Sequence, residues 1–126
     1  MMPLSTPRKL PVVEDRSRGE RCCEPTGPGL SDAEADQFAG DFDVLAHPIR
    51  IRLLDLLARN GGKVCVCDLE ASVPVKQPTV SHHLKLLRQA GLIDWEKRGL
   101  WSYYFINAEA MRALRARIVD RLNAYA

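Results

Sequence analysis

Apolar side chains recur every three or four positions between residues 48 and 60, which aligns them along one face of a helix. The repeating residues are Ile49, Leu53, Leu56 and Leu57. Pro48 suits the first helical turn, and Gly61-Gly62 marks the end of the segment. The pattern therefore predicts a helix over 48–60.

A second helical pattern begins near Gln77 and reaches Gly91. Val80, Leu84 and Leu87 form its inward stripe, so the polar side chains between them face outward. The outward residues are Thr79, Ser81, His82, Lys85 and Arg88. A shorter helix is predicted in CDLEASV, over 67–73, and Pro74 stops it.

Two more helices are predicted to flank this centre. SDAE, over 31–34, has the capping-box arrangement with Ser31 as the cap, and the helix that follows continues to about Ala46. Asn107 can cap the last helix, which carries one apolar stripe. That stripe consists of Met111, Leu114, Ile118 and Leu122.

Between the last two helices the pattern changes from helix to strand. LIDWE and LWSYYFI are rich in β-branched and aromatic residues, and Lys97-Arg98-Gly99 separates them, which predicts a β-hairpin. The chain is therefore mainly α-helical with one hairpin. A short helix, a turn of about three residues and a second amphipathic helix form a helix-turn-helix, and the hairpin makes it winged.

Composition divides the 126 residues into an arm and a domain. Residues 1–30 hold five of the eight prolines and no aromatic residue, so we expect a flexible arm over 1–30 and one domain over 31–126. No apolar run reaches the roughly 20 residues that span a bilayer, and the first residues lack a secretory h-region. We therefore expect a cytoplasmic protein, in a compartment where persistent disulfides are rare.

Charge is distributed unevenly, although the net charge is only +2. The predicted first helix has five acidic residues and no basic one, whereas the segment 74–106 has five basic and two acidic side chains. This contrast places a DNA-binding surface on the second helix of the helix-turn-helix and on the hairpin. The candidate DNA-binding residues are Gln77, Thr79, Ser81, His82, His83, Lys85, Arg88, Lys97 and Arg98. Of these, His83 lies nearest the buried edge and is also a candidate for holding the helix in place.

The four cysteines form two pairs, Cys22-Cys23 and Cys65-x-Cys67. Disulfides, buried thiols and a metal site are the alternatives. Residues at i and i+2 lie about 200° apart on a helix, so Cys65 and Cys67 reach one ion only at or just before a helix start. We expect Cys67 near the N-cap, where the helix N-terminus lowers the thiol pKa.

Three segments in order resemble the ArsR/SmtB family of metal-responsive repressors: VLAHPIRIRLLDLL, VCVCDL and QPTVSHHLKLLRQAGLI, followed by a hairpin. The resemblance covers roughly 38–122. It implies a winged-helix homodimer, paired through the first and last helices, that leaves its double-stranded operator DNA when metal binds. Family members with a wholly local arsenic site resemble CVCDLC, and Glu70 stands here where their third cysteine would be.

The missing third local cysteine makes Cys22-Cys23 the remaining source of thiolates. Members with an N-terminal vicinal pair look like As(III)/Sb(III) sensors that use three thiolates, here Cys22, Cys23 and one of Cys65 and Cys67. Members with two arm cysteines plus CVC resemble Cd(II)/Pb(II) sensors with up to four, and Zn(II) is a further alternative. Soft thiolates suit these ions.

Other functions fit the sequence less well. A thiol-redox-sensing repressor would use the same DNA surface and oxidise the cysteines. An enzyme is disfavoured because the chain has no phosphate-binding glycine loop and no nucleophile elbow. Residues 108–126 contain no histidine, which excludes the family's His-based site on the last helix, and we expect His47 to be structural.

Overall fold

The computed structural model describes residues 27–126, which are mainly helical with one antiparallel hairpin, as predicted. The elements in chain order are α1 (Asp32–Leu45), α2 (Pro48–Asn60), β1 (Val64–Cys65), α3 (Val66–Ala71), α4 (Gln77–Gln89), β2 (Ile93–Arg98), β3 (Trp101–Ile106) and α5 (Ala108–Asn123). Within this range, none of the helices is both long enough and apolar enough to cross a membrane.

The predicted caps are present. The Ser31 hydroxyl accepts from the Glu34 backbone N–H while the Glu34 carboxylate accepts from the Ser31 N–H, which completes the capping box of α1. Asn107 accepts from the Ala110 N–H at the start of α5. His47 caps α2 by accepting from the Ile49 N–H, which is the structural role expected for this histidine.

The buried core joins the helix-turn-helix to the hairpin. Leu53 from α2, Leu69 from α3 and Leu84 from α4 are almost completely buried. The remaining buried apolar residues are Leu57, Val64, Val73, Val80, Leu87, Leu92, Ile93 and Leu114. The inward stripe predicted for α4 is therefore confirmed.

The sheet has three strands in the order β1-β3-β2. The hairpin β2–β3 was predicted, and Gly99 permits its tight turn with a φ of +61°. β1 was not predicted: Val64 pairs with Tyr104 and Cys65 with Tyr103, so the cysteine segment is the third strand of the wing sheet.

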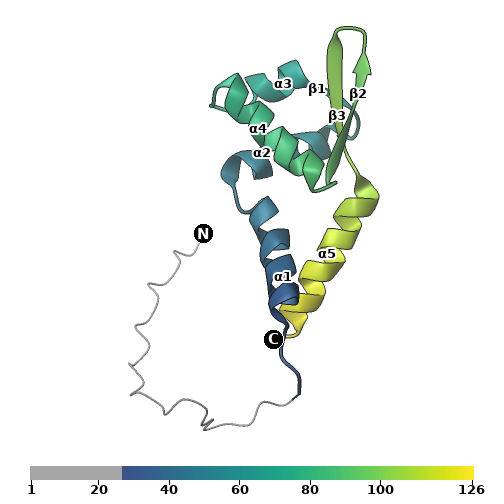
Figure 1. Cartoon of the computed structure of the whole chain (residues 1–126). Coiled ribbons are helices and arrows are strands. Elements are labelled where there is room, and N and C mark those ends of the chain that lie inside the picture. The colour runs from purple at the N-terminus through teal and green to yellow at the C-terminus, as the bar shows by residue number, and fades with distance from the viewer. Residues whose placement is uncertain (1–26) are drawn as a thin grey trace.

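The first and last helices extend together away from the hairpin and the helix-turn-helix (Figure 1). Asp41 of α1 accepts two hydrogen bonds from the Arg117 guanidinium of α5, at 2.9 and 3.1 Å. Each of the two helices therefore has a partner within the chain, and their other faces stay exposed at Phe42, Val119 and Leu122.

Candidate nucleic-acid interface and thiol site

The helix-turn-helix is formed by α3 and α4, joined by residues 72–76. The connection is longer than the three residues predicted because α3 already ends at Ala71. Five of the predicted DNA-binding side chains along α4 are exposed and lie on its outer side. They are Gln77, Thr79, Ser81, His82 and Lys85.

The other basic candidates lie at the end of α4 and on the wing. The Arg88 guanidinium stacks over the Trp95 ring of β2 at 5.0 Å, which joins the end of α4 to the wing. Lys97 and Arg98 are exposed near the hairpin turn. The adjacent Leu100 is the most exposed large apolar residue at the tip, with 92% of its surface accessible.

His83 differs from the other DNA-binding candidates because it is buried, with 6% of its surface exposed. Its Nδ1 lies 3.2 Å from an Arg50 guanidinium nitrogen, and its ring lies 4.2 Å from that of His47. This enclosure favours the role of holding the helix in place, which was the alternative to DNA contact expected for His83. Burial, followed by the positive charges around it, lowers the pKa of His83.

Arg50 holds three elements together, which the sequence alone did not indicate. Its guanidinium donates to the backbone carbonyls of Val44 and Asp43, both at 2.8 Å, while it contacts His83. These contacts connect the end of α1 to α2 and α4. Arg50, in the segment VLAHPIRIRLLDLL, is thus a buried connector between these elements.

Cys65 and Cys67 lie at the junction of β1 and α3. Cys65 ends the strand and is the N-cap of α3, and Cys67 lies in the first turn. The N-cap is Cys65, and Cys67 lies two residues after it, which confirms the expected position of Cys67 near the N-cap. Their sulfur atoms are 2.7 Å apart, which agrees with the prediction that both reach one point only at a helix start.

The pKa of the Cys67 thiol is raised, whereas a lowered pKa was expected at a helix start. The Cys67 thiol donates to the Cys65 sulfur, and this hydrogen bond is the main reason that the pKa of Cys67 is raised. Burial and the nearby Cys65 and Asp68 charges add to the increase, whereas the Asp68 backbone N–H opposes it. The local thiol pair outweighs the helix N-terminus, which was expected to lower the pKa.

The described residues supply two soft donors to this site. Among residues 27–126, no group of three or more histidine, cysteine or acidic side chains is arranged to hold a metal ion. Glu70 follows on α3, where a third thiol would complete a local site. Cys22 and Cys23 lie outside the described residues. The donor chemistry fits half of a soft-ion site, because Cys67 is exposed and both sulfurs face one point.

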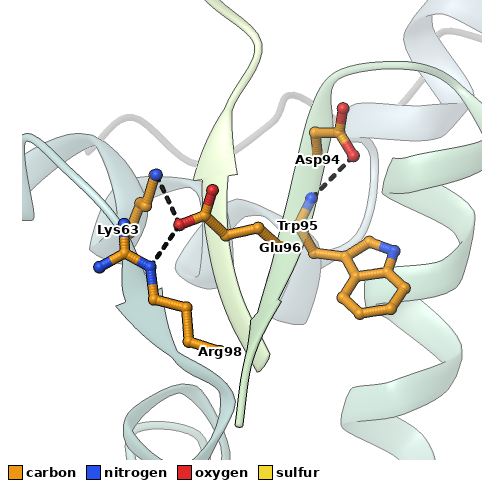
Figure 2. Close-up of polar contacts among 5 residues, drawn as sticks. All are labelled: Lys63, Asp94, Trp95, Glu96 and Arg98. Atoms are coloured by element: carbon orange, nitrogen blue, oxygen red, sulfur yellow. Dashed lines mark hydrogen bonds and ion pairs between the residues drawn. The ribbon is translucent and has the colours of Figure 1, made fainter. Parts of the chain in front are cut away.

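A polar cluster connects the cysteine segment to the wing (Figure 2). Glu96 Oε1 accepts from Lys63 Nζ at 2.6 Å and from Arg98 Nε at 2.7 Å. These two hydrogen bonds, with that from Lys63 the larger effect, hold the pKa of Glu96 below its usual value. Glu96 and Arg98 are two residues apart on β2, whereas Lys63 is 33 positions from Glu96, and the sequence did not indicate its contact.

Comparison with known sequences assigns the central part of the chain. Residues 47–94 match the family model described as "Bacterial regulatory protein, arsR family". An uncharacterized HTH-type transcriptional regulator of Methanocaldococcus jannaschii is 37% identical over 69% of this chain and 96% of its own length. The arsenical resistance operon repressor of Bacillus subtilis (strain 168) is 42% identical, over 62% of this chain and 73% of its own. The cadmium resistance transcriptional regulatory protein of Listeria innocua is 31% identical, over 61% of this chain and 64% of its own length.

Solved structures agree in fold. The crystal structure of a "possible transcriptional regulator for arsenical resistance" has a TM-score of 0.57 and 34% identity, and covers 69% of this chain and 96% of that one. A homodimeric winged helix-turn-helix domain from Mycobacterium bovis has a TM-score of 0.55 and 29% identity. The match covers 75% of this chain and 90% of that domain. The chain belongs to the ArsR family of winged helix-turn-helix DNA-binding transcriptional regulators, which are not enzymes.

Proposed function

We propose that this protein is a metalloid-responsive repressor that binds operator DNA as a homodimer and leaves it when As(III) or Sb(III) binds its cysteine thiolates. The observation that carries the proposal is the pair of adjacent sulfurs, Cys65 and Cys67, at the start of the first helix of the helix-turn-helix. The similarity to an arsenical resistance operon repressor supports arsenic as the inducer.

Two thiolates leave a soft ion incompletely coordinated, so further donors are needed. The remaining cysteines of the chain are Cys22 and Cys23, in the arm that we assign to residues 1–30. We assign three-coordinate As(III) to Cys22, Cys23 and one of Cys65 and Cys67. Residues 31–126 then form the DNA-binding and dimerisation domain.

The DNA surface consists of the outer side of α4 and the wing. Hydroxyl and amide side chains at the start of α4 suit hydrogen bonds to base edges in the major groove. Lys85, Arg88, Lys97 and Arg98 supply phosphate attraction, which is independent of sequence. A dimer would read two half-sites about one helical turn apart.

The faces left exposed on α1 and α5 support the homodimer. An apolar groove lies beside them, lined mainly by Leu45, Ile51, Leu54, Ile106 and Met111. The acidic side chains of α1 complement the basic ones of α5. A related domain from Mycobacterium bovis is a homodimer. A second copy of the chain would cover this surface through its own first and last helices.

A second candidate inducer is Cd(II) or Pb(II), with Zn(II) as a further alternative, held by all four thiolates. The similarity to a cadmium resistance regulator favours this candidate. A repressor that senses thiol oxidation would use the same cysteines, and the short distance between Cys65 and Cys67 favours oxidation to a disulfide. These functions differ in the number of sulfurs that each requires.

The test is a titration of the reduced full-length chain with arsenite and, separately, with Cd(II). Sulfur-to-metal charge-transfer absorbance reports binding, and fluorescence anisotropy of labelled operator DNA reports release. We expect arsenite to release the operator, and Cys22→Ser with Cys23→Ser to abolish that release. Release that survives both substitutions would contradict the role of the arm. Release by peroxide but by neither ion would select the redox function.

A further inference from the structure

Cys65 and Glu96 lie in one row of residues across the wing sheet. Cys65 pairs with Tyr103, and Tyr103 pairs with Glu96 on its other side. Directly opposite residues in antiparallel strands point to the same face. Arg98 is two residues from Glu96 on β2 and so lies on this face, and Lys63, just before β1, reaches it through its hydrogen bond to Glu96. The cation contacts agree, because Lys63 lies over the Phe105 ring and Arg98 over the Tyr103 ring.

Lys63 and Arg98 use the same acceptor atom. Both donate to Oε1 of Glu96, at 2.6 and 2.7 Å, and Figure 2 shows the carboxylate between them. Lys63 belongs to the segment that leads into β1, whereas Arg98 ends β2 beside the wing turn. A displacement of β1 therefore changes how strongly Glu96 holds the wing arginine.

We propose that Lys63 and Arg98 compete for Glu96, and that occupation of the thiol site decides which of them the carboxylate holds. Glu96 is in this role a positioning residue for Arg98 and does not itself contact DNA. The inference rests on the proposed function and adds to it a path from the cysteines to the DNA surface.

In the operator-bound state, Arg98 leaves Glu96 for a DNA phosphate. Lys63 remains on the carboxylate, so that no unpaired negative charge faces the phosphates. Arg98, with 65% of its side chain exposed, is free to make this move at little cost.

Occupation of the thiol site reverses the exchange. The Cys67 thiol donates to the Cys65 sulfur. Whichever of the two coordinates the ion gives up this hydrogen bond, so occupation of the site changes the position of Cys65 at the end of β1. The movement of β1 withdraws Lys63, Glu96 takes Arg98 back, and the wing loses a phosphate contact.

A double-mutant cycle on the full-length chain tests the competition. Lys63→Met leaves Glu96 with Arg98 alone, so we expect operator affinity without inducer to fall about two- to five-fold, the range of an exposed ion pair. Glu96→Gln frees Arg98, so affinity rises and the release by arsenite or Cd(II) weakens by a similar factor. In the Glu96→Gln background, Lys63→Met should have no further effect.

Asp94→Asn is the matched control for charge. Asp94 lies on the same strand and face as Glu96, but within residues 27–126 its carboxylate accepts from the Trp95 backbone N–H and from no side chain (Figure 2). This variant should keep the full ratio of operator Kd with and without inducer. By thermodynamic linkage, operator DNA should weaken Cd(II) binding by the same factor as Cd(II) weakens operator binding. Charge-transfer absorbance measures the Cd(II) affinity. Glu96→Gln should reduce this common factor.

Two results would overturn the competition. The first is that Lys63→Met lowers operator affinity equally in the wild-type and Glu96→Gln backgrounds, which is simple loss of positive charge. The second is that Glu96→Gln and Asp94→Asn change the ratio of operator Kd with and without inducer by the same factor. A wild-type protein that binds operator DNA but responds to no ion overturns the proposed function as well.

Discussion

Single buried side chains decide the stability of this small domain. Leu53 is fully buried in the core and belongs to α2, the helix that contacts both α4 and β3. Leu100, the same residue type, has 92% of its surface exposed at the wing turn. The two leucines therefore form a matched pair for measuring the effect of burial.

Leu53→Ala should lower the free energy of unfolding by about 2–5 kcal/mol, because it removes buried methyl groups and leaves a cavity. Leu100→Ala should change it by less than about 0.5 kcal/mol. Urea unfolding followed by circular dichroism measures both. Equal losses in the two variants would contradict the burial described for the core.

His83 makes the folded state sensitive to mild acid. Its pKa in the folded protein is below the ordinary value of 6.5, so between the two values the unfolded chain binds more protons. Stability is therefore present above about pH 6.5 and is lost as the pH falls toward the lowered pKa. Chemical unfolding measured from pH 7.5 to 5 should show this decline.

His83→Gln should flatten the decline between pH 6.5 and 5, whereas His82→Gln should not, because His82 is exposed. The comparison of slopes separates this effect from the general acid response of the carboxylates. An unchanged slope in His83→Gln would mean that the buried ring is not the group that takes up the proton.

At the scale of elements, caps determine where helices begin. Asn107 ends the wing and starts α5, where its side chain accepts from the Ala110 N–H at 3.1 Å. Asn107→Ala should cost about 1 kcal/mol of stability, the typical value of an N-cap. Asn123→Ala, at the other end of α5, is the control. The capping role would be contradicted if the thermal unfolding midpoint of Asn107→Ala were no lower than that of Asn123→Ala.

The element that carries the thiol site is a short strand followed by a short helix. Residues 67–73 were predicted to be helical, and the α-helix α3 covers 66–71. β1 has only two residues, which is too few to show a period of two along the sequence. The strand exists because β3 offers Tyr103 and Tyr104 as partners, and those partners come from about forty positions later.

At the scale of the whole molecule, α1 and α5 extend away from the helix-turn-helix and the hairpin (Figure 1). Val119 and Leu122 are about half exposed on α5. If a second copy covers this face, a charge placed there meets an apolar surface and destabilises the dimer. The oligomeric state is therefore sensitive to single substitutions on α5.

Val119→Glu should convert the dimer to a monomer in analytical ultracentrifugation and weaken operator binding. Asn123→Glu adds the same charge to an exposed position near the end of the helix and should leave the dimer intact. A Val119→Glu protein that sediments as the wild type would place the dimer interface elsewhere.

The sequence by itself determined the order of helices, the hairpin and the inward stripe of α4, because each rests on local periodicity and capping. It also identified the exposed polar face of α4 and the two cysteine positions at a helix start. These features depend on residues within a few positions of one another, where spacing and side-chain type are sufficient.

Only the tertiary structure decided which distant residues meet. It buried His83 against Arg50, paired Cys65 with Tyr103, and brought Lys63 and Arg98 to one oxygen of Glu96. The contacts of Arg50 with His83, of Cys65 with Tyr103 and of Lys63 with Glu96 join residues 33 or more positions apart, and local periodicity carries no record of them. The position of the two cysteines at a helix start was thus predictable, whereas the pairing of Cys65 in the wing sheet was not.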